Sequence, residues 1–346
     1  MTKRPVTVLL LAAGSPGDFA FIKGLKQSEK YDVTLHAADI DPLKGNLYLP
    51  EIDEAYIIPR YDAANYQDVI FDLVEILGVD VLISDLDEEL PMLSAMSVKL
   101  AEIGCHIVLP PENGLRICLD KMATYERLAG NVVQPKTVLG GSVKADCDNL
   151  LKKSGRVILK PRYLRGGRGV DLAENDQELD FYSDRHMKRG PFIVQQYIEG
   201  REYNCSMLHD MTGRLIYCAV RLKLENRLVK SNTIAAKVVR DVMVREAAIC
   251  AVRDIGLNRG FNNVEIIVSD GLPYVIDVNG GRWAGQDMNL LSSGVNQAEM
   301  YLDLALGAPV TPIDIPIGAI SLKIKSDVIV WQKQIDSLVW LGRVPE

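Results

Sequence analysis

The stretch NVEIIVSDGLPYVIDVNGGR, residues 263–282, decides the fold assignment. Apolar residues alternate with other residues on both sides of the central run SDGLP, whose composition is typical of a tight turn, so two antiparallel strands are expected. A hairpin centred on Gly271 would set Glu265 opposite Asp277, and Asn279 would follow two positions later on the same face. Opposed carboxylates repel each other, and a divalent cation between them would remove this repulsion. A surface hairpin with both acids in water explains the same pattern, so the rest of the chain must decide.

The composition of the 346-residue chain, with 48% hydrophobic residues, suggests about two or three domains with ample core. The net charge of −7 argues against nucleic acid as the main partner and leaves an anionic substrate dependent on local Lys and Arg residues. The six cysteines show no C-x-x-C pair, which is typical of reduced thiols and favours a cytoplasmic location. The four scattered histidines indicate no zinc site. The apolar run 6–13 is too short to span a membrane, so no membrane partner is expected.

Strand-like and helix-like segments alternate through the first 112 residues. Apolar runs with strand character lie at 6–13, 32–41, 79–84 and 105–109, and apolar residues at helical spacing lie at 66–77 and 93–103. This alternation predicts a doubly wound α/β domain with a parallel sheet.

Polar segments follow several of these predicted strands, and ligands of such sheets bind at the carboxyl ends of the strands. The segments expected on this rim are 14–17, 39–41 and 85–89. The acids among them suit a substrate amine or hydroxyl, or serve as helix caps and solvated loop residues. The turn reads G-S-P-G rather than G-x-G-x-x-G, so a nicotinamide-dependent enzyme is kept only as a minor alternative.

A basic, glycine-rich loop follows an apolar strand in RVILKPRYLRGGRGV, residues 156–170. Glycines let backbone N–H groups approach phosphate oxygens closely, and Lys160 and the arginines add positive charge. No G-K-[ST] opens a following helix, so the loop is not a Walker motif. We interpret it as a phosphate-binding loop rather than a solvated hairpin. The run 113–128 before it is expected to be helical.

The order of these segments resembles the ATP-grasp superfamily, in particular one synthetase half of the carbamoyl phosphate synthetase large chain and the related stand-alone carboxylate–amine ligases. The resemblance covers residues 5–310. Its motifs are Asp120-Lys121, ILKPRYLRGGRG, VQQYIEGRE, Glu265 with Asp277-Val278-Asn279, and SSGVNQAEMYLDLALGAP. It implies an α/β and α+β fold. A doubly wound pre-ATP-grasp domain would cover residues 1–112 and a two-lobed ATP-grasp domain residues 113–310, with its lid lobe at about 122–196. Residues 311–346 would form a tail.

The resemblance also implies a role for each matching residue. ATP phosphates would meet the two lysines and the glycines of the lid, Lys121, Lys160, Gly166, Gly167 and Gly169. Adenine would meet Gln196, Tyr197 and Ile198, and the ribose hydroxyls Glu202. Mg²⁺, with Mn²⁺ as an alternative, would be held by Glu265, Asp277 and Asn279. Lys160 and Arg282 would be catalytic, facing the transferred phosphoryl group.

The motif after the second strand departs from the family in two ways. The family has Glu where this chain has the shorter Asp277, and it reads E-x-N-P-R where this chain reads D-V-N-G-G-R. Arg282 therefore comes one residue late, on a turn softened by glycine. These departures leave ATP binding expected and put the kind or efficiency of the chemistry in question.

The activity implied by the resemblance is an ATP-dependent ligase that activates a small carboxylate as an acyl phosphate and joins it to an amine. Its expected partners are ATP, the carboxylate and the amine, with a homodimer as the expected assembly. Two alternatives stay open: an ATP-binding protein of the same fold with weak or lost catalysis, and a carboxylating activity of the carbamoyl phosphate synthetase or biotin carboxylase kind. The sequence leaves the acid, the nucleophile and the function of residues 311–346 undetermined.

Overall fold

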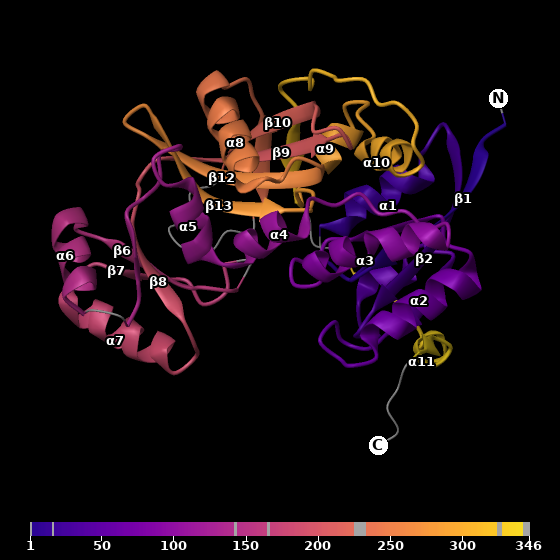
Figure 1. Cartoon of the computed structure of the whole chain (residues 1–346), viewed down its shortest axis with the longest axis horizontal. Coiled ribbons are helices and arrows are strands. Elements are labelled where there is room, and N and C mark those ends of the chain that lie inside the picture. The colour runs from indigo at the N-terminus through magenta and orange to yellow at the C-terminus, as the bar shows by residue number, and fades with distance from the viewer. Residues whose placement is uncertain are drawn as a thin grey trace.

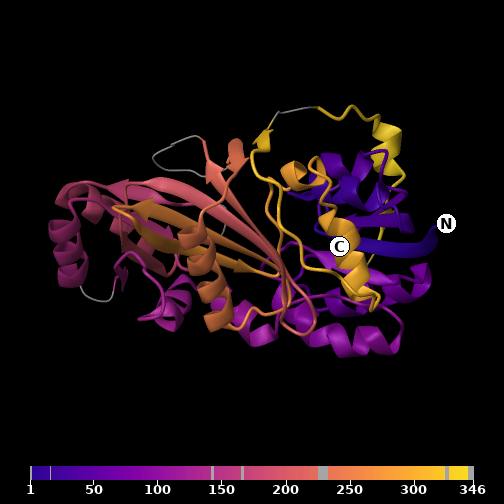
Figure 2. The same cartoon turned by 90° about the horizontal axis from the view of Figure 1, so that it is seen from above.

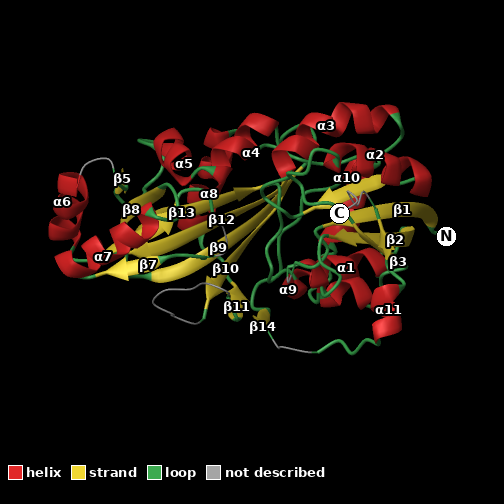
Figure 3. Ribbon diagram, turned by 90° about the horizontal axis from the view of Figure 1, so that it is seen from below, coloured by secondary structure: helices red, strands yellow, loops and turns green. Residues whose placement is uncertain are grey.

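The computed structural model of the chain describes residues 2–15, 17–141, 144–164, 167–224, 233–323 and 327–341. The strands in these ranges form three sheets. Figure 3 shows a five-stranded N-terminal sheet at one end, a four-stranded small sheet at the other and a six-stranded large sheet between them. The fold is therefore mixed α/β and α+β, as the sequence predicts.

The N-terminal sheet is parallel and has the strand order β15-β3-β2-β1-β4. Its strands in the first part of the chain are β1 (Arg4–Leu11), β2 (Tyr31–Asp39), β3 (Glu54–Ile57) and β4 (Val81–Ser84). The helices between and after them are α1 (Asp18–Lys26), the 3₁₀ helix η1 (Gly45–Tyr48), α2 (Tyr66–Leu77) and α3 (Leu90–Glu102). This arrangement confirms the predicted doubly wound domain.

Alternate residues of β1 show why its sequence is a continuous apolar run. Leu9 and Leu11 pack against the residues of α2 and α3, whereas Val8 and Leu10 pack on the other face against α1. Both faces are covered, so neither set of side chains meets water. The strand predicted at 105–109 is wrong, because this segment makes only an isolated bridge between His106 and Val81.

The large sheet is antiparallel and has the order β13-β12-β9-β10-β11-β14. Its strands are β9 (Arg201–His209), β10 (Leu215–Lys223), β11 (Ala235–Val238), β12 (Gly260–Ser269), β13 (Leu272–Gly280) and β14 (Ile320–Leu322). Helix α8 (Val242–Ile255) packs on one face through Val244, Ala248 and Val252, whose spacing is that of an amphipathic helix.

The small sheet has the order β5-β8-β6-β7 and its own hydrophobic cluster. Its strands are β5 (Thr137–Leu139), β6 (Val157–Pro161), β7 (Asp171–Ala173) and β8 (Phe192–Gln196), and its helices are α6 (Lys144–Ser154) and α7 (Asp176–Met187). Figure 1 shows this part at the end of the molecule furthest from α1.

The run predicted to be helical at 113–128 is helical except at Asp120 and forms α4 (Glu112–Leu119) and α5 (Lys121–Leu128). Asp120 is extended (φ −113°, ψ 106°) and accepts hydrogen bonds from the backbone N–H groups of Met122 and Ala123. The break occurs because Asp120 caps the second helix instead of continuing the first.

The segment after residue 310 runs from one sheet to another. β14 pairs with β11 in the large sheet, and after α11 (Gln332–Asp336) the strand β15 (Val339–Trp340) pairs with β3 in the N-terminal sheet. Figure 2 shows this segment in yellow as it passes along the outside of the N-terminal domain. No described helix is long and apolar enough to cross a membrane.

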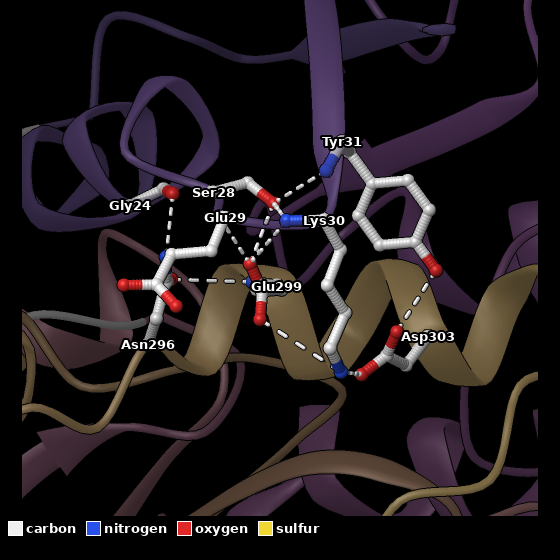
Figure 4. Close-up of polar contacts among 8 residues, drawn as sticks. All are labelled: Gly24, Ser28, Glu29, Lys30, Tyr31, Asn296, Glu299 and Asp303. Carbon is white, nitrogen blue, oxygen red and sulfur yellow. Dashed lines mark hydrogen bonds and ion pairs between the residues drawn. The ribbon is translucent and has the colours of Figure 1, made fainter. Parts of the chain in front are cut away.

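Helix α10 (Gln297–Ala305), which follows α9 (Met288–Leu291), joins the C-terminal part of the chain to the turn after α1 (Figure 4). The carboxylate of Glu299 accepts hydrogen bonds from Ser28 Oγ and the backbone N–H of Glu29, both at 2.6 Å. One turn later, Asp303 accepts a hydrogen bond from the Tyr31 hydroxyl at 2.8 Å and forms an ion pair with Lys30. The two acids thus fasten α10 to the N-terminal domain.

Candidate functional site

A cavity of about 360 Å³ lies where the three sheets meet. It is lined by most of the residues to which the resemblance gave roles: Lys121, Lys160, Gly167, Gln196, Tyr197, Ile198, Glu202, Glu265, Asp277, Asn279 and Arg282. Gly169 does not line it, and a Cβ at Gly169 would contact Pro161. Gly166 lies outside the described residues. Side chains far apart in the sequence therefore converge on one cavity.

The hairpin of β12 and β13 supplies two of the acids that line the cavity, Glu265 and Asp277. Glu265 pairs with Asp277 and Asn263 with Asn279, so the predicted opposition of the two carboxylates is confirmed. The predicted centre at Gly271 is wrong, because Ser269 pairs with Leu272 around a two-residue turn. A β-bulge between the turn and Glu265 adds one residue on β13, which restores the predicted register at the acids.

Lys223 on β10 is a site residue that the sequence reasoning missed. Its ammonium lies 2.6 Å from Glu265 Oε2 and also forms an ion pair with Glu202. Burial alone would lower the pKa of Lys223, but the carboxylates of Glu265 and Glu202 raise it well above its usual value. Only knowledge of the strand order could have identified Lys223, because β9, which carries Glu202, lies between β10, which carries Lys223, and β12, which carries Glu265. The acids predicted for ribose and metal thus share one internal cation.

Two further lysines face the cavity from the small sheet and from α5. The Lys160 ammonium lies 3.4 Å from the backbone carbonyl of Ile276, and burial lowers its pKa to about 8. Lys121 begins α5 and donates a hydrogen bond to the carbonyl of Leu164. Both ammonium groups contact carbonyl oxygens rather than carboxylates, which suits lysines that would bind phosphate oxygens.

Arg282, just after the hairpin of β12 and β13, connects this hairpin with the rim of the N-terminal sheet. Its Nη1 lies 2.7 Å from Asp87 Oδ2, and its Nη2 lies 3.9 Å from Asp85 Oδ2. Ser15 Oγ donates a hydrogen bond to Asp85 at 2.8 Å, and the backbone N–H of Gly14 donates to Asp39 at 2.9 Å. The segments predicted to share one rim therefore meet, and two of the rim acids pair with an arginine.

A buried ion pair fixes the loop that follows Arg282. Arg221 and Asp287 are fully buried and paired, and Asp287 also accepts a hydrogen bond from the backbone N–H of Ala284 at 3.1 Å. Trp283 in the same loop stacks on Phe21 of α1, with ring centroids 4.2 Å apart. These contacts hold Trp283, Gly285 and Gln286 at the wall of the cavity.

Lys323 is a second residue that the sequence reasoning missed. It directly follows β14 in the segment for which no function was predicted, and its side chain lines the cavity near Gly285. No sequence signal distinguishes it, because it lies in an otherwise ordinary strand-like run.

The donor atoms on the hairpin fit a hard divalent cation. Glu265, Asp277 and Asn279 offer carboxylate and amide oxygens, the ligand types that Mg²⁺ prefers. Among the residues that the structure describes, no group of three or more His, Cys, Asp or Glu side chains could hold a metal ion. A cation on this hairpin would therefore take further oxygens from phosphates or water, which is the usual arrangement for Mg²⁺ bound with a nucleotide.

Two family models match the chain: an ATP-grasp domain over residues 118–285 and a PylC-like N-terminal domain over residues 8–108. The D-alanine–D-alanine ligase of Thermotoga maritima is 30% identical over 179 residues, which are 47% of this chain and 56% of that ligase. The chain thus spans little more than half the length of this relative.

Solved structures with the same fold have lower sequence identity. An L-amino acid ligase from Bacillus licheniformis has a TM-score of 0.67 and 17% identity over 88% of this chain and 75% of its own. N5-carboxyaminoimidazole synthetase from Staphylococcus aureus, solved with ADP, has a TM-score of 0.70 and 15% identity over 91% of this chain and 81% of its own. Such identities show the fold alone. The two matching family models confirm the predicted resemblance: the chain contains an ATP-grasp domain, which follows a PylC-like N-terminal domain.

Proposed function

We propose that the chain is an ATP-dependent ligase that activates a small carboxylate as an acyl phosphate and joins it to an amine. The observation that carries the proposal is the pairing of Glu265 with Asp277 inside a cavity that also holds Lys121 and Lys160. Acids that can hold Mg²⁺ and lysines that can hold phosphates are together what phosphoryl transfer from ATP requires.

The nucleotide would lie between the small and large sheets. Gln196, Tyr197 and Ile198, at and just after the end of β8, would meet adenine, and Glu202 on β9 would hold the ribose hydroxyls. The phosphates would be held by Lys121 on α5, Lys160 on β6 and Gly167 in the loop after β6.

Glu265, Asp277 and Asn279 would hold Mg²⁺, with Mn²⁺ as an alternative. When bound, Mg²⁺ offsets the negative charge of the β- and γ-phosphates and orients them for transfer. Lys223 would keep Glu202 and Glu265 in place by sharing its ammonium between them. Asp277 is shorter than the Glu of the family and has no partner lysine of this kind among the described residues.

The reaction would proceed in two transfers. A carboxylate oxygen of the first substrate attacks the γ-phosphorus of ATP, the bond to the bridging oxygen breaks, and ADP leaves. The unprotonated amine then attacks the acyl carbon, and the C–O bond to phosphate breaks. The nitrogen gives up one proton, which leaves with the phosphate or to water, and an amide is formed. Lys160 and Arg282 would offset charge on the transferred group, and a closed cavity would exclude water, which hydrolyses an acyl phosphate.

The proposal is tested by ADP release with Mg-ATP and a panel of amino acids and other small carboxylates, each with and without hydroxylamine. Hydroxamate formed with one acid would establish acyl phosphate chemistry and identify the first substrate. The variant Glu265→Gln with Asp277→Asn is expected to lose ADP release while its thermal unfolding stays cooperative.

Full turnover in that double variant would exclude the metal assignment. ATP binding without ADP release on any acid would favour the alternative of a binding protein with lost catalysis. The homodimer and the cytoplasmic location remain predictions of the sequence.

A further inference from the structure

Lys323 brings a cation into the cavity from the C-terminal segment. It directly follows β14, and its backbone N–H donates a hydrogen bond to the carbonyl of Ile234 at 2.8 Å, which fixes the position of its Cα beside β11. The side chain lines the same cavity as the acidic hairpin. The pairing of β14 in the large sheet therefore places this lysine at the cavity wall.

The Lys323 ammonium lies where two glycines approach each other. A Cβ added to Gly285 would lie 3.2 Å from Lys323 Nζ, and one added to Gly17 would lie 3.8 Å from the Cα of Gly285. Gly17 belongs to the turn after β1, so this point is at the N-terminal side of the cavity. The residues expected to meet adenine line the same cavity but come from the end of β8 and the residues after it, in a different part of the chain.

Two other cations of the cavity have carboxylate partners, whereas Lys323 has no hydrogen-bond or ion-pair partner for its side chain among the residues that the structure describes. Arg282 pairs with Asp87, and Lys223 pairs with Glu202 and Glu265. Partial burial lowers the pKa of Lys323, and no neighbouring carboxylate opposes this shift. An ammonium without a counter-ion at a cavity wall is a site for an anionic group of a ligand.

We propose that Lys323 is a specificity-determining residue that binds a carboxylate of a substrate other than the carboxylate that is phosphorylated. The inference rests on the proposed ligase activity. Lys121 and Lys160 are the lysines proposed for the phosphates, whereas the Lys323 ammonium lies beside Gly285, which itself approaches Gly17 of the N-terminal turn. The carboxylate belongs either to the amine-bearing acceptor, as in an amino acid, or to a donor with a second carboxyl group.

The first experiment separates the donor from the acceptor. Hydroxylamine has no carboxylate, so hydroxamate formation reports on the donor alone. Lys323→Met keeps the length of the side chain and removes the charge, and Lys323→Arg keeps the charge. Lys323→Met loses one charge-assisted hydrogen bond, which is expected to raise KM about tenfold or more for the substrate whose carboxylate is bound. Lys323→Arg keeps the charge, so its KM is expected to stay much closer to that of wild type.

A rise in the donor KM for hydroxamate would assign the carboxylate to the donor. An unchanged donor KM with a raised KM for alanine as acceptor, but not for alaninamide, would assign it to the acceptor. The control is Lys237→Met, on the strand that pairs with β14 but outside the cavity lining. Equal KM values for all substrates in Lys323→Met and in wild type would overturn the proposal.

Binding provides a readout that does not depend on turnover. Calorimetric titration of wild type and Lys323→Met with alanine, glutamate and succinate is expected to show binding that weakens about tenfold in the variant, whereas alaninamide is unaffected. If wild type forms no hydroxamate but this difference in binding is seen, the ligase activity is wrong and the carboxylate site stands. If wild type binds none of these acids, or both proteins bind them equally, the carboxylate site is wrong.

Discussion

Lys223 Nζ lies 2.6 Å from Glu265 Oε2, so the acid expected to bind metal already faces a cation of its own chain. Only 4% of the Lys223 side chain is exposed, and the same ammonium pairs with Glu202. One buried ammonium therefore offsets the charge of the two acids that are expected to bind the ribose and the metal. This contact leads to the first prediction.

Replacing Lys223 by Met is expected to lower the free energy of unfolding by about 2–4 kcal/mol, because two largely buried carboxylates lose their shared cation. Mg²⁺ with ADP should restore more stability in this variant than it adds to wild type, since the cation would take over the charge compensation. Thermal unfolding with and without Mg-ADP measures both effects. Lys237→Met serves as the control, and an equal Mg-ADP shift in Lys223→Met and wild type would contradict the prediction.

ATP affinity is expected to fall as the pH rises above about 8. Burial lowers the pKa of Lys160 to about 8, so this lysine is charged below that pH and loses its proton above it. Only the charged form attracts phosphate, although bound ATP itself would raise the pKa and move the change to higher pH. The measurement is the ATP Kd from pH 7 to pH 10.

Lys160→Arg provides the control for this pH dependence, because a guanidinium stays charged throughout the range. Its ATP Kd should change less with pH than that of wild type, even if the affinity itself is lower. A wild-type Kd that is constant between pH 7 and pH 10 would show that Lys160 does not control binding.

Asp120 is expected to act on stability and on the position of Lys121 rather than on chemistry. Its carboxylate caps α5 and forms paired hydrogen bonds with Arg162, at 2.6 Å and 2.5 Å. Asp120→Ala should lower the free energy of unfolding by about 1–3 kcal/mol through loss of the cap and the ion pair. Urea unfolding measures this loss, and Asp120→Asn, which keeps a capping oxygen, should lose less. An equal loss in both variants would argue against the cap.

The contact between α10 and the turn after α1 is expected to stabilise the union of the two domains. Glu299→Ala removes an acceptor for Ser28 Oγ and the backbone N–H groups of Glu29 and Lys30, which should cost about 1–3 kcal/mol. Glu246→Ala on the exposed side of α8 is the control. If the contact joins the domains, thermal unfolding of Glu299→Ala should show a lower midpoint or a separation into two transitions; an unchanged single transition would contradict this role.

The order of the elements and most of the cavity residues could be predicted from the sequence, because each motif consists of neighbouring residues in one turn or strand. The hairpin of β12 and β13 shows the limit of such local prediction. The opposition of Glu265 and Asp277 was predicted from a wrong turn centre and holds only because of a β-bulge, which alternation alone does not reveal.

Lys223 and Lys323 could not be predicted for a different reason. Each reaches the cavity in a sheet built by the pairing of strands that are distant in sequence, β9 with β12 for Lys223 and β11 with β14 for Lys323. The residues next to Lys223 and Lys323 in the sequence match no functional motif. Long-range pairing therefore determined which lysines belong to the site.

The strands β14 and β15, which follow each other in sequence, belong to two different sheets, and this has a consequence for how the molecule is expected to move. β14 is held in the large sheet and β15 in the N-terminal sheet, and both hydrophobic clusters of those sheets contain residues from each. The small sheet has a separate cluster. We therefore expect the N-terminal and large sheets to move as one unit, and the small sheet to move separately about its connections between α5 and β5 and between β8 and β9.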